Sequence, residues 1–435
     1  MDEETIKKEA NEKEVINKET INKENNQKTH HNSVTKHNTQ NKKSNWKINF
    51  TLVLLSLFFS LLFLELILAQ FYPQSILKYQ HVIKPTEYHP VLGWFNKKKF
   101  SEESVICNKV YKVKTNNLGF RDDEEYTSEK DPTKKRIVIL GDSFMFGEGL
   151  DNKEIYTTQL RNILGNKYEI WNLGVPAYGT DQEALLLHEL FNEAGKNNWP
   201  DVVIVGFFQN DLANIHSLYA GNETERGFKP RVVIRNGTLG IVNCCPVPKI
   251  ETTPVIFHSF FERFHTYIFF RDKYNIILSK IHPRQKKNYL QEYHESENTM
   301  LVGYNFQEDM DLLVGITDEL RKMAKEHNFK LVFLNIPHNF QVDKKAFQDY
   351  LSQFSDVNES FFKADRLNRI MNALANSRKD ITYIDLLPIF EKEGNIPGEK
   401  SNIFYPCTRD MHWNALRAKR AAEETTKVLK EKRIV

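Results

Sequence analysis

The sequence predicts an α/β protein with a doubly wound, mainly parallel five-stranded sheet between two layers of helices, preceded by a transmembrane helix. Three features of the 435 residues lead to this fold class: a polar amino-terminal stretch, one long apolar segment, and an alternation of short apolar runs with amphipathic stretches from residue 136 onward. At roughly 150 residues per domain, the length allows two or three units. The overall charge of +3 argues against a dedicated nucleic-acid-binding protein, which would carry a strong basic excess.

Residues 1–46 are polar and low in complexity. They contain nine Asn, and Lys, Glu, Gln, His and Thr make up most of the remainder. Such a segment cannot bury enough apolar surface to offset the entropy of ordering it, so we expect a disordered tail. A solvated tail is the simpler interpretation of this composition, and an interaction tail is the alternative.

An apolar run from Ile48 to Ala69 follows the tail. Its 22 residues contain one charge, Glu65, near the carboxyl end of the run. At 1.5 Å per residue, a helix of this length extends about 33 Å and can cross a hydrocarbon core of about 30 Å. A secretory signal has a shorter apolar region, and no cleavage motif of small residues precedes Phe71. Residues 48–69 are therefore predicted to form a transmembrane helix.

The flanking charges predict how this helix is oriented. Four lysines lie between residues 36 and 47, and only two lie between residues 71 and 84. Because basic flanks stay inside, the tail is predicted to be cytoplasmic and residues 71–435 to be extracytoplasmic. In that oxidising space one or two disulfides can form, with a connectivity that the spacing does not reveal, among Cys107, Cys244, Cys245 and Cys407.

The globular part begins with an irregular lead-in, 71–135, and continues as one predicted domain, 136–435. Short, continuous apolar runs are typical of parallel strands buried on both faces. Such runs predict strands at 136–141, 168–174, 201–208, 329–337 and 381–390. Amphipathic stretches predict helices near 152–165, 180–195, 306–327 and 414–431. This alternation favours right-handed crossovers and a ligand site at the carboxyl ends of the strands.

A long insertion, 212–305, separates the third predicted strand from the next helix of the sheet domain. It contains an aromatic run, IFHSFFERFHTYIFF, and the adjacent Cys244 and Cys245. We expect the insertion to lie over the carboxyl edge of the sheet, beside any active site. The helically spaced aromatic residues predict a local core or a patch near the membrane. A substrate-binding cap is the alternative.

Four motifs converge on the carboxyl edge of the predicted sheet. The first strand ends in GDSFMFGEG, which presents Ser143 after a sharp glycine turn, and the second ends in NLGVPAYG, with Gly174. The third ends in GFFQND, with Asn210, and DMHWN places Asp410 and His412 just before the last helix. The tripeptide GDS alone is more often a turn than a nucleophile. A P-loop and a dinucleotide fingerprint are both excluded by the glycine spacing.

Taken in order, these motifs resemble the SGNH or GDSL family of serine hydrolases over about residues 136–430. The resemblance implies the SGNH-hydrolase sandwich, which is flavodoxin-like, with Ser143 as nucleophile, His412 as general base and Asp410 holding the imidazole. It also implies an oxyanion hole made by the N–H groups of Ser143 and Gly174 and by the amide of Asn210. The chemistry is coherent, because a serine needs an adjacent base and a developing oxyanion gains roughly 3–4 kcal/mol from one well-placed donor.

The chain departs from the family's pattern at two positions. Phe208 stands where the third motif usually has glycine, and we expect it to crowd the pocket without removing the oxyanion hole. The usual Asp-x-x-His spacing of the last motif falls on Arg409, so Asp410, two residues before His412, is the expected acid. Asp385, at the end of the fifth strand, is the reserve candidate.

The sequence therefore predicts a membrane-anchored serine esterase that hydrolyses acyl esters, O-acetyl esters among them, of a small molecule or a carbohydrate. An O-acyltransferase acting on cell-surface polysaccharide would use the same triad. A non-catalytic carbohydrate-binding protein is the alternative from another class. No cofactor is expected, and no metal site is supported because the histidines are scattered and Cys244-Cys245 lacks matching ligand spacing.

Overall fold

The computed structural model describes residues 45–72, 85–106, 109–192, 195, 198–216, 229–235, 238–242, 261, 264–281, 297–303, 305–394 and 412–435. The predicted tail up to residue 44, the four cysteines, Arg409 and Asp410 lie outside these residues. The chain divides into two compact units, Met1–Pro73 and Gln74–Val435, which are described separately.

The first unit contains helix α2, Trp46–Phe71. Nearly all of its large apolar side chains are exposed, and they surround the helix rather than forming one face. Within the part of the chain that the structure describes, α2 is the one helix long and apolar enough to cross a membrane, with a mean hydropathy of 2.7. Its length and composition are those of a membrane anchor or of a signal segment.

The second unit is built on a five-stranded parallel sheet, as the sequence predicts. Its strands are β5 (Lys135–Gly141), β6 (Tyr168–Gly174), β7 (Val202–Phe207), β10 (Lys330–Asn335) and β11 (Ile381–Asp385). Their order across the sheet is β11-β10-β7-β5-β6, and every neighbouring pair is parallel. In this flavodoxin-like order the chain reverses direction across the sheet between β5 and β7, which is where such folds bind ligands.

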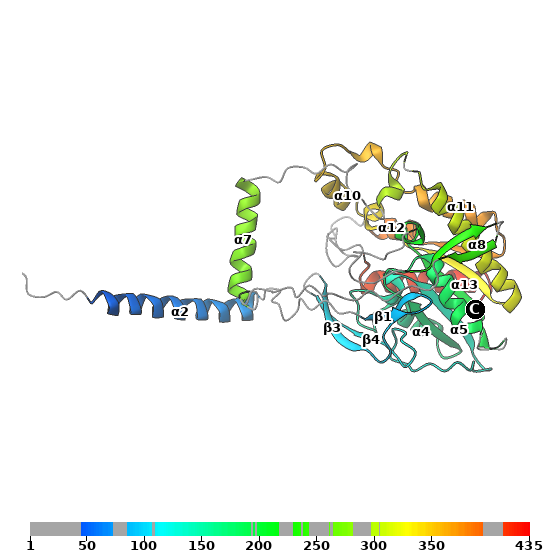
Figure 1. Ribbon diagram of the computed structural model, residues 1–435, viewed down its shortest axis with the longest axis horizontal. Coiled ribbons are helices and arrows are strands. Elements are labelled where there is room, and N and C mark those ends of the chain that lie inside the picture. Colours follow the sequence, from blue (N-terminus) through cyan, green and yellow to red (C-terminus); the bar gives the residue numbers. More distant parts are fainter. Residues whose placement is uncertain are drawn as a thin grey trace, which may run out of the picture. The chain divides into compact units, whose positions relative to one another are not determined.

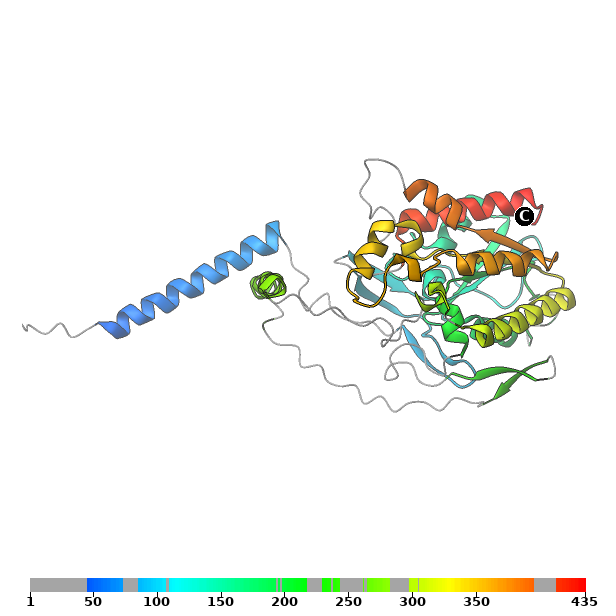
Figure 2. The ribbon, with the colours of Figure 1, turned by 90° about the horizontal axis from the view of Figure 1, so that it is seen from above.

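Helices cover both faces of the sheet, which confirms the predicted three-layer arrangement (Figures 1 and 2). Along β5, Val138 and Leu140 face one core, and Ile137 and Ile139 face the other. The first core is closed by α5 (Thr180–Asn192), α8 (Gln307–His327) and α11 (Arg366–Asn376). The second is closed by α4 (Tyr156–Leu164), α12 (Leu387–Gly394) and α13 (Ala415–Glu431).

The fifth strand was predicted to extend to residue 390 and this is wrong, because β11 ends at Asp385 and α12 begins at Leu387. The cause is local: the Asp385 carboxylate accepts the Leu387 N–H at 3.0 Å and starts the helix.

The connections between these strands and helices contain further elements. They are α3 (Ser143–Phe146), α6 (Asn210–His216), β8 (Arg231–Arg235), β9 (Thr238–Val242), α7 (His265–Ile281), η5 (Glu297–Met300), α9 (Asn339–Val342), α10 (Lys344–Leu351) and η6 (Glu359–Phe361).

The segment before the sheet forms two antiparallel hairpins, β1 (Thr86–His89) with β2 (Gly93–Asn96), and β3 (Ser101–Ile106) with β4 (Lys109–Lys114). The second hairpin packs Tyr111 and Val113 against Phe146 of α3. This segment therefore contacts the short helix that follows the first strand of the sheet.

Arg121, from the NNLGFRD phrase, joins this segment to the sheet domain. Its guanidinium is fully buried and donates to the carbonyl oxygens of Phe146, Gly147 and Leu150. Its Nε donates to Asn152 Oδ1 at 3.1 Å. Burial lowers the pKa of Arg121 to about 10, so the group stays charged at neutral pH and supports the carboxyl end of α3.

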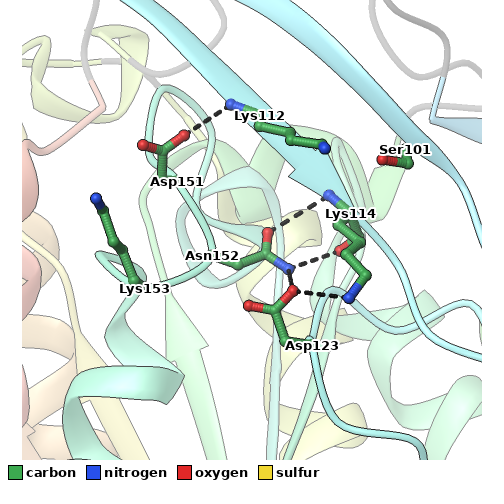
Figure 3. A pocket seen from close by; sticks show the side chains of 7 residues that line it. All are labelled: Ser101, Lys112, Lys114, Asp123, Asp151, Asn152 and Lys153. Carbon is green, nitrogen blue, oxygen red and sulfur yellow. Dashed lines mark hydrogen bonds and ion pairs between the residues drawn. The ribbon is translucent and has the colours of Figure 1, made fainter.

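A polar hollow of about 490 Å³ lies between the β3–β4 hairpin and the turn that leads to α4 (Figure 3). Several of its polar groups are paired: Asn152 Nδ2 donates to the Lys114 carbonyl at 2.9 Å, and the Lys112 N–H donates to Asp151 at 2.8 Å. The Lys114 ammonium pairs with Asp123 at 3.1 Å. We interpret the hollow as the outer side of the contacts around Arg121, since Asn152 lines the hollow and also accepts the hydrogen bond from Arg121 Nε.

Replacing Arg121 by Met should destabilise the folded chain by about 3 kcal/mol, because several buried carbonyl oxygens lose their donors at once. The measurement is the thermal unfolding midpoint in detergent micelles. Arg369→Met removes an exposed arginine that pairs with Asp365 at 3.2 Å, and should change stability by at most about 0.5 kcal/mol. Equal midpoints for the two variants would contradict this account of Arg121.

Candidate active site

A row of three glycines forms the floor of the candidate site. Gly141 of β5 stands in register between Gly174 of β6 and Gly206 of β7, at the carboxyl ends of the three strands. A methyl group added to Gly174 would lie 2.2 Å from the Phe146 nitrogen, and one added to Gly206 would lie 2.6 Å from Met145. The row therefore lets α3 rest directly on the strand ends, where a side chain at any of the three positions would push it away.

Ser143 is the first residue of α3, which is four residues long. Asp142 precedes it and caps the helix, accepting the Phe144 N–H at 2.9 Å. Residues at the start of a helix have no intrahelical partner for their N–H groups. The fold thus presents the Ser143 hydroxyl together with its N–H at the sheet edge, with its neighbours Phe144, Met145 and Phe146 all buried.

His412 reaches the same place from the other end of the chain. It lies just before α13, whose capping residue Asn414 accepts the Arg417 N–H at 3.1 Å. The next residue, Trp413, is buried and packs edge-to-face on Phe144, with ring centroids 5.5 Å apart. The His412 ring itself contacts Phe144 at 5.0 Å between centroids. Burial of Trp413 thus fixes the position of the histidine.

Ser143 and His412 are joined by a hydrogen bond of 2.7 Å between Oγ and Nε2. The two residues are 269 positions apart, so the contact is made by the fold and not by local sequence. Nε2 can accept the hydroxyl hydrogen when the ring hydrogen is on Nδ1. A serine in this contact is within reach of the base that would activate it.

Asn210 lies across the switch point, at the start of α6 after β7. Its Nδ2 donates to Asp142 Oδ2 at 3.3 Å, which leaves one amide hydrogen for another acceptor. Gly174, the other expected oxyanion donor, has its N–H directed to Asn172 Oδ1 at 2.9 Å. Gly174 therefore contributes the close approach of α3, and its N–H would have to leave Asn172 to reach a ligand.

Two further positions have packing roles that the sequence did not indicate. Phe208 is fully buried and stacks on Phe144 and His338, at 4.4 and 5.6 Å between centroids, so it supports the site from within the core. Asp385, the reserve acid, accepts hydrogen bonds from Asn335 and Asn368 at 3.1 Å as well as capping α12. These bonds account for Asp385 as a structural residue.

A tight turn, Val175–Tyr178, follows β6 at the same edge of the sheet as Ser143. The Tyr178 N–H donates to the Val175 carbonyl at 3.2 Å, Pro176 occupies the second position, and Ala177 has φ of 61°. This is the geometry of a type II turn, whose third position normally requires glycine. The β1–β2 hairpin holds the turn: Trp94 Nε1 donates to the Pro176 carbonyl at 3.0 Å, and the Tyr178 hydroxyl donates to the Trp94 carbonyl at 2.6 Å.

Four buried carboxyl groups surround the base of the site, namely those of Asp142, Asp181, Glu183 and Asp211. Asp181 pairs with the buried ammonium of Lys229 at 2.8 Å. Burial raises the pKa of Glu183 well above its usual range, and the charges of Asp142 and Asp181 raise it further. Burial also raises the pKa of Asp211, with the same sign of contribution from Glu183. Burial raises the pKa of Asp142 and Asp181 as well, so all four carboxyl groups are shifted toward the neutral form, Glu183 and Asp211 the most.

The sequence reasoning identified Ser143, Asn210 and His412 but overlooked several residues that hold them. Gly206 is one, and the available signal was that each of the first three predicted strands contains a glycine at or near its end. Trp94 and Arg121 are others, and no sequence pattern indicates which carbonyls they reach. Within the ranges that the structure describes, no group of His, Cys, Asp and Glu side chains could hold a metal ion.

Comparisons with known proteins give structural matches only. A scan against protein-family models finds no match, and a search of curated proteins finds none. TesA matches at 13% identity with a TM-score of 0.32, covering 69% of this chain and 100% of its own. The acetyl xylan esterase AlAXEase matches at 12% identity with a TM-score of 0.34, covering 68% of this chain and 99% of its own.

A member of the lipolytic protein G-D-S-L family from Veillonella parvula DSM 2008 matches at 11% identity with a TM-score of 0.34, covering 68% of this chain and 98% of its own. The structural neighbours are thus the SGNH or GDSL lipolytic and acetyl esterases that the motifs resemble. Identities and TM-scores this low carry no argument about activity, which has to come from the residues themselves.

Replacing Ala177 by Gly should stabilise the chain by about 1 kcal/mol, because an L side chain at positive φ is strained and glycine is not. The thermal unfolding midpoint in detergent should rise. The matched control is Ala184→Gly, inside α5, where glycine should instead lower stability by about 0.5–1 kcal/mol. A fall in midpoint for both variants would show that the turn is not strained by Ala177.

Replacing Glu183 by Gln should make the folded chain more stable at high pH, because the buried carboxyl of Glu183 opposes folding increasingly as the pH rises. In the unfolded chain this carboxyl ionises near pH 4.3, whereas in the folded chain it keeps its proton to higher pH. Folding is therefore disfavoured progressively as the pH rises from about 4.3 through the raised pKa. The unfolding midpoint of Glu183→Gln should match the parent near pH 4 and exceed it increasingly toward pH 8. A constant difference across that range would refute the assignment.

Proposed function

We propose that this chain is a membrane-anchored serine esterase whose catalytic unit acts on acyl esters outside the cytoplasmic membrane. The observation that carries the proposal is the 2.7 Å hydrogen bond between Ser143 Oγ and His412 Nε2. It lies at the carboxyl edge of a parallel sheet, at the switch point where such sheets bind ligands. A histidine with a purely structural role has no reason to form a hydrogen bond with the first residue of α3 at this edge.

In the proposed reaction Ser143 Oγ attacks the carbonyl carbon of the ester while its proton passes to His412 Nε2. The tetrahedral intermediate then breaks its bond to the leaving oxygen, which takes the proton from His412 and departs as the alcohol. The acyl group remains on Ser143. Water, losing a proton to His412, attacks this acyl-enzyme and releases the carboxylic acid, with Ser143 regaining its proton.

The negative oxygen of each tetrahedral intermediate requires donors near Ser143. We assign the Ser143 N–H and the second amide hydrogen of Asn210 to it, with the Gly174 N–H joining if it leaves Asn172. The bond from Asn210 Nδ2 to Asp142 holds the amide with its nitrogen toward the nucleophile. Each such donor is worth roughly 3–4 kcal/mol in the transition state. Asp410, outside the described residues, is proposed to complete the triad.

The anchoring part of the proposal rests on α2 and on its charged flanks. We propose that α2 spans the membrane once, with its lysine-rich amino side in the cytoplasm. The carboxyl unit would then meet acylated small molecules or carbohydrates in the extracytoplasmic space. An esterase held at the membrane in this way acts on substrates at or near the cell surface.

The test is labelling of the full chain in detergent micelles with a fluorophosphonate, read by intact mass. We expect one adduct, because the phosphorus is attacked by a serine that has an adjacent base. The adduct should be lost in Ser143→Ala and should fall by about a hundredfold or more in rate in His412→Ala, which removes the general base.

The matched control is Ser352→Ala, which removes an exposed hydroxyl that donates to the Asp349 carbonyl at 2.7 Å. This variant should label at the parent rate. Labelling that persists in Ser143→Ala would overturn the assignment of the nucleophile. A folded parent that takes no label, with its unfolding midpoint intact, would overturn the proposed catalysis.

A further inference from the structure

Helix α7 in the insertion carries an exposed apolar stripe. Tyr267, Phe270, Tyr274 and Ile277 are 37, 54, 60 and 53% exposed, and they recur every three or four residues. At 100° per residue these four side chains fall within an arc of about 80° on one side of the helix. The helix is regular from His265 to Ile281 (Figure 1). The stripe is therefore continuous along about three turns.

Charged residues border this stripe in an ordered way. On the same helical projection, Lys273 lies along one border and Arg271 along the other. Asp272, the one acidic residue of α7, lies on the opposite side, about 180° from the centre of the stripe. In the structure the Lys273 ammonium lies 5.5 Å from the centre of the Phe269 ring, and Arg271 pairs with Asp272 at 3.1 Å. On a lipid surface both long side chains can turn so that their apolar stems lie along the stripe and their charges above it.

The sequence around α7 is strongly basic. Residues 262–287 contain seven Lys and Arg against two acidic residues, a net charge of +5, whereas the whole chain has a net charge of +3. The basic excess of the sequence is thus concentrated in and around the segment that forms α7. A helix with an apolar face rich in aromatic residues, flanked by Lys and Arg, has the properties of an interfacial membrane helix.

We propose that α7 lies on an anionic phospholipid surface, with Tyr267, Phe270, Tyr274 and Ile277 inserted among the upper acyl chains. This goes beyond the proposed esterase activity and rests on it only in placing the chain at a bilayer through α2. Tyrosine suits this depth because its ring is apolar and its hydroxyl remains in the polar headgroup layer. The flanking cations then meet lipid phosphates.

A lipid surface fits these residues better than a protein partner or a substrate cap. A protein-facing stripe needs no basic border of one sign, whereas attraction to anionic lipid depends on it. A cap over the active site would meet substrate, and a net charge of +5 has no counterpart in a neutral ester. With the anchor proposed for α2, α7 gives the catalytic unit a second attachment and restricts its orientation to the membrane.

The experiment uses the full chain in lipid nanodiscs that contain phosphatidylglycerol and a phospholipid with a diazirine in its acyl chain. After illumination, cross-linked peptides are mapped by mass spectrometry. We expect cross-links in two regions, 46–71 and 265–281, with those of α7 concentrated on the stripe residues. In discs of phosphatidylcholine alone, the yield at 265–281 should fall by about threefold or more, while the yield at 46–71 should not change.

The test variant Phe270→Asp/Ile277→Asp should lower the α7 yield by about tenfold, since it places two charges in the acyl region. Asp272→Ser, on the opposite side, is the matched control: it releases Arg271 from its 3.1 Å ion pair and should not lower the yield. Labelling of α2 in the same sample shows whether anchoring itself fails, and fluorophosphonate labelling shows whether the catalytic unit is folded.

Two results would overturn the proposal. One is efficient labelling of 46–71 with none at 265–281. The other is a yield at 265–281 that the double aspartate variant does not change. If that variant alters hydrolysis of a water-soluble ester while the lipid cross-links stay as they were, the stripe docks on protein as a cap instead.

Discussion

The close approach of α3 to the strand ends is the constraint on which the site depends. Gly141, Gly174 and Gly206 lie in register, and Met145 occupies the space that their missing side chains leave. Without this row, a four-residue helix could not rest on the edge of the sheet. Ser143 would then be displaced from its 2.7 Å hydrogen bond with His412, whose own position is fixed by the buried Trp413. Backbone packing is thus a precondition for the contact between Ser143 and His412.

The segment before the sheet contributes to the same arrangement from the outside. Arg121 supplies donors to the carbonyl oxygens at the end of α3, and Trp94 supplies one to the turn after β6. Helix α3 and the turn are both short, and neither can satisfy all of its own polar backbone groups. The lead-in segment looks like a linker in the sequence, but it is part of the packing that supports Ser143.

Much of this architecture could be predicted, because buried parallel strands leave a clear hydrophobic signal. The five strands, their helices and the residues at their carboxyl ends follow from that pattern, and Ser143 and His412 are brought together as expected. The rest depends on contacts between distant segments, which no local pattern encodes. Arg121 pairs with backbone carbonyls that any residue could supply, and Phe208 looks like an obstruction until its ring is found in the core. The end of β11 was misjudged because one aspartate cap outweighs the apolar residues that follow it.

The buried carboxyl groups pose an electrostatic problem that the fold has to solve. Four negative charges beside Ser143 would oppose the oxyanion of an acyl-transfer reaction, and in a low dielectric this opposition would be large. Burial raises the pKa of both Glu183 and Asp211, which favours their neutral forms, and Lys229 pairs with Asp181. Burial also raises the pKa of Asp142, which precedes Ser143, whereas the Phe144 N–H, the nearby His412 and the Asn210 amide lower it. In the proposed reaction the attack of Ser143 would place a proton on His412, and a negative charge retained on Asp142 would favour that protonated ring. The neutral amide of Asn210 would then meet the oxyanion without adding charge.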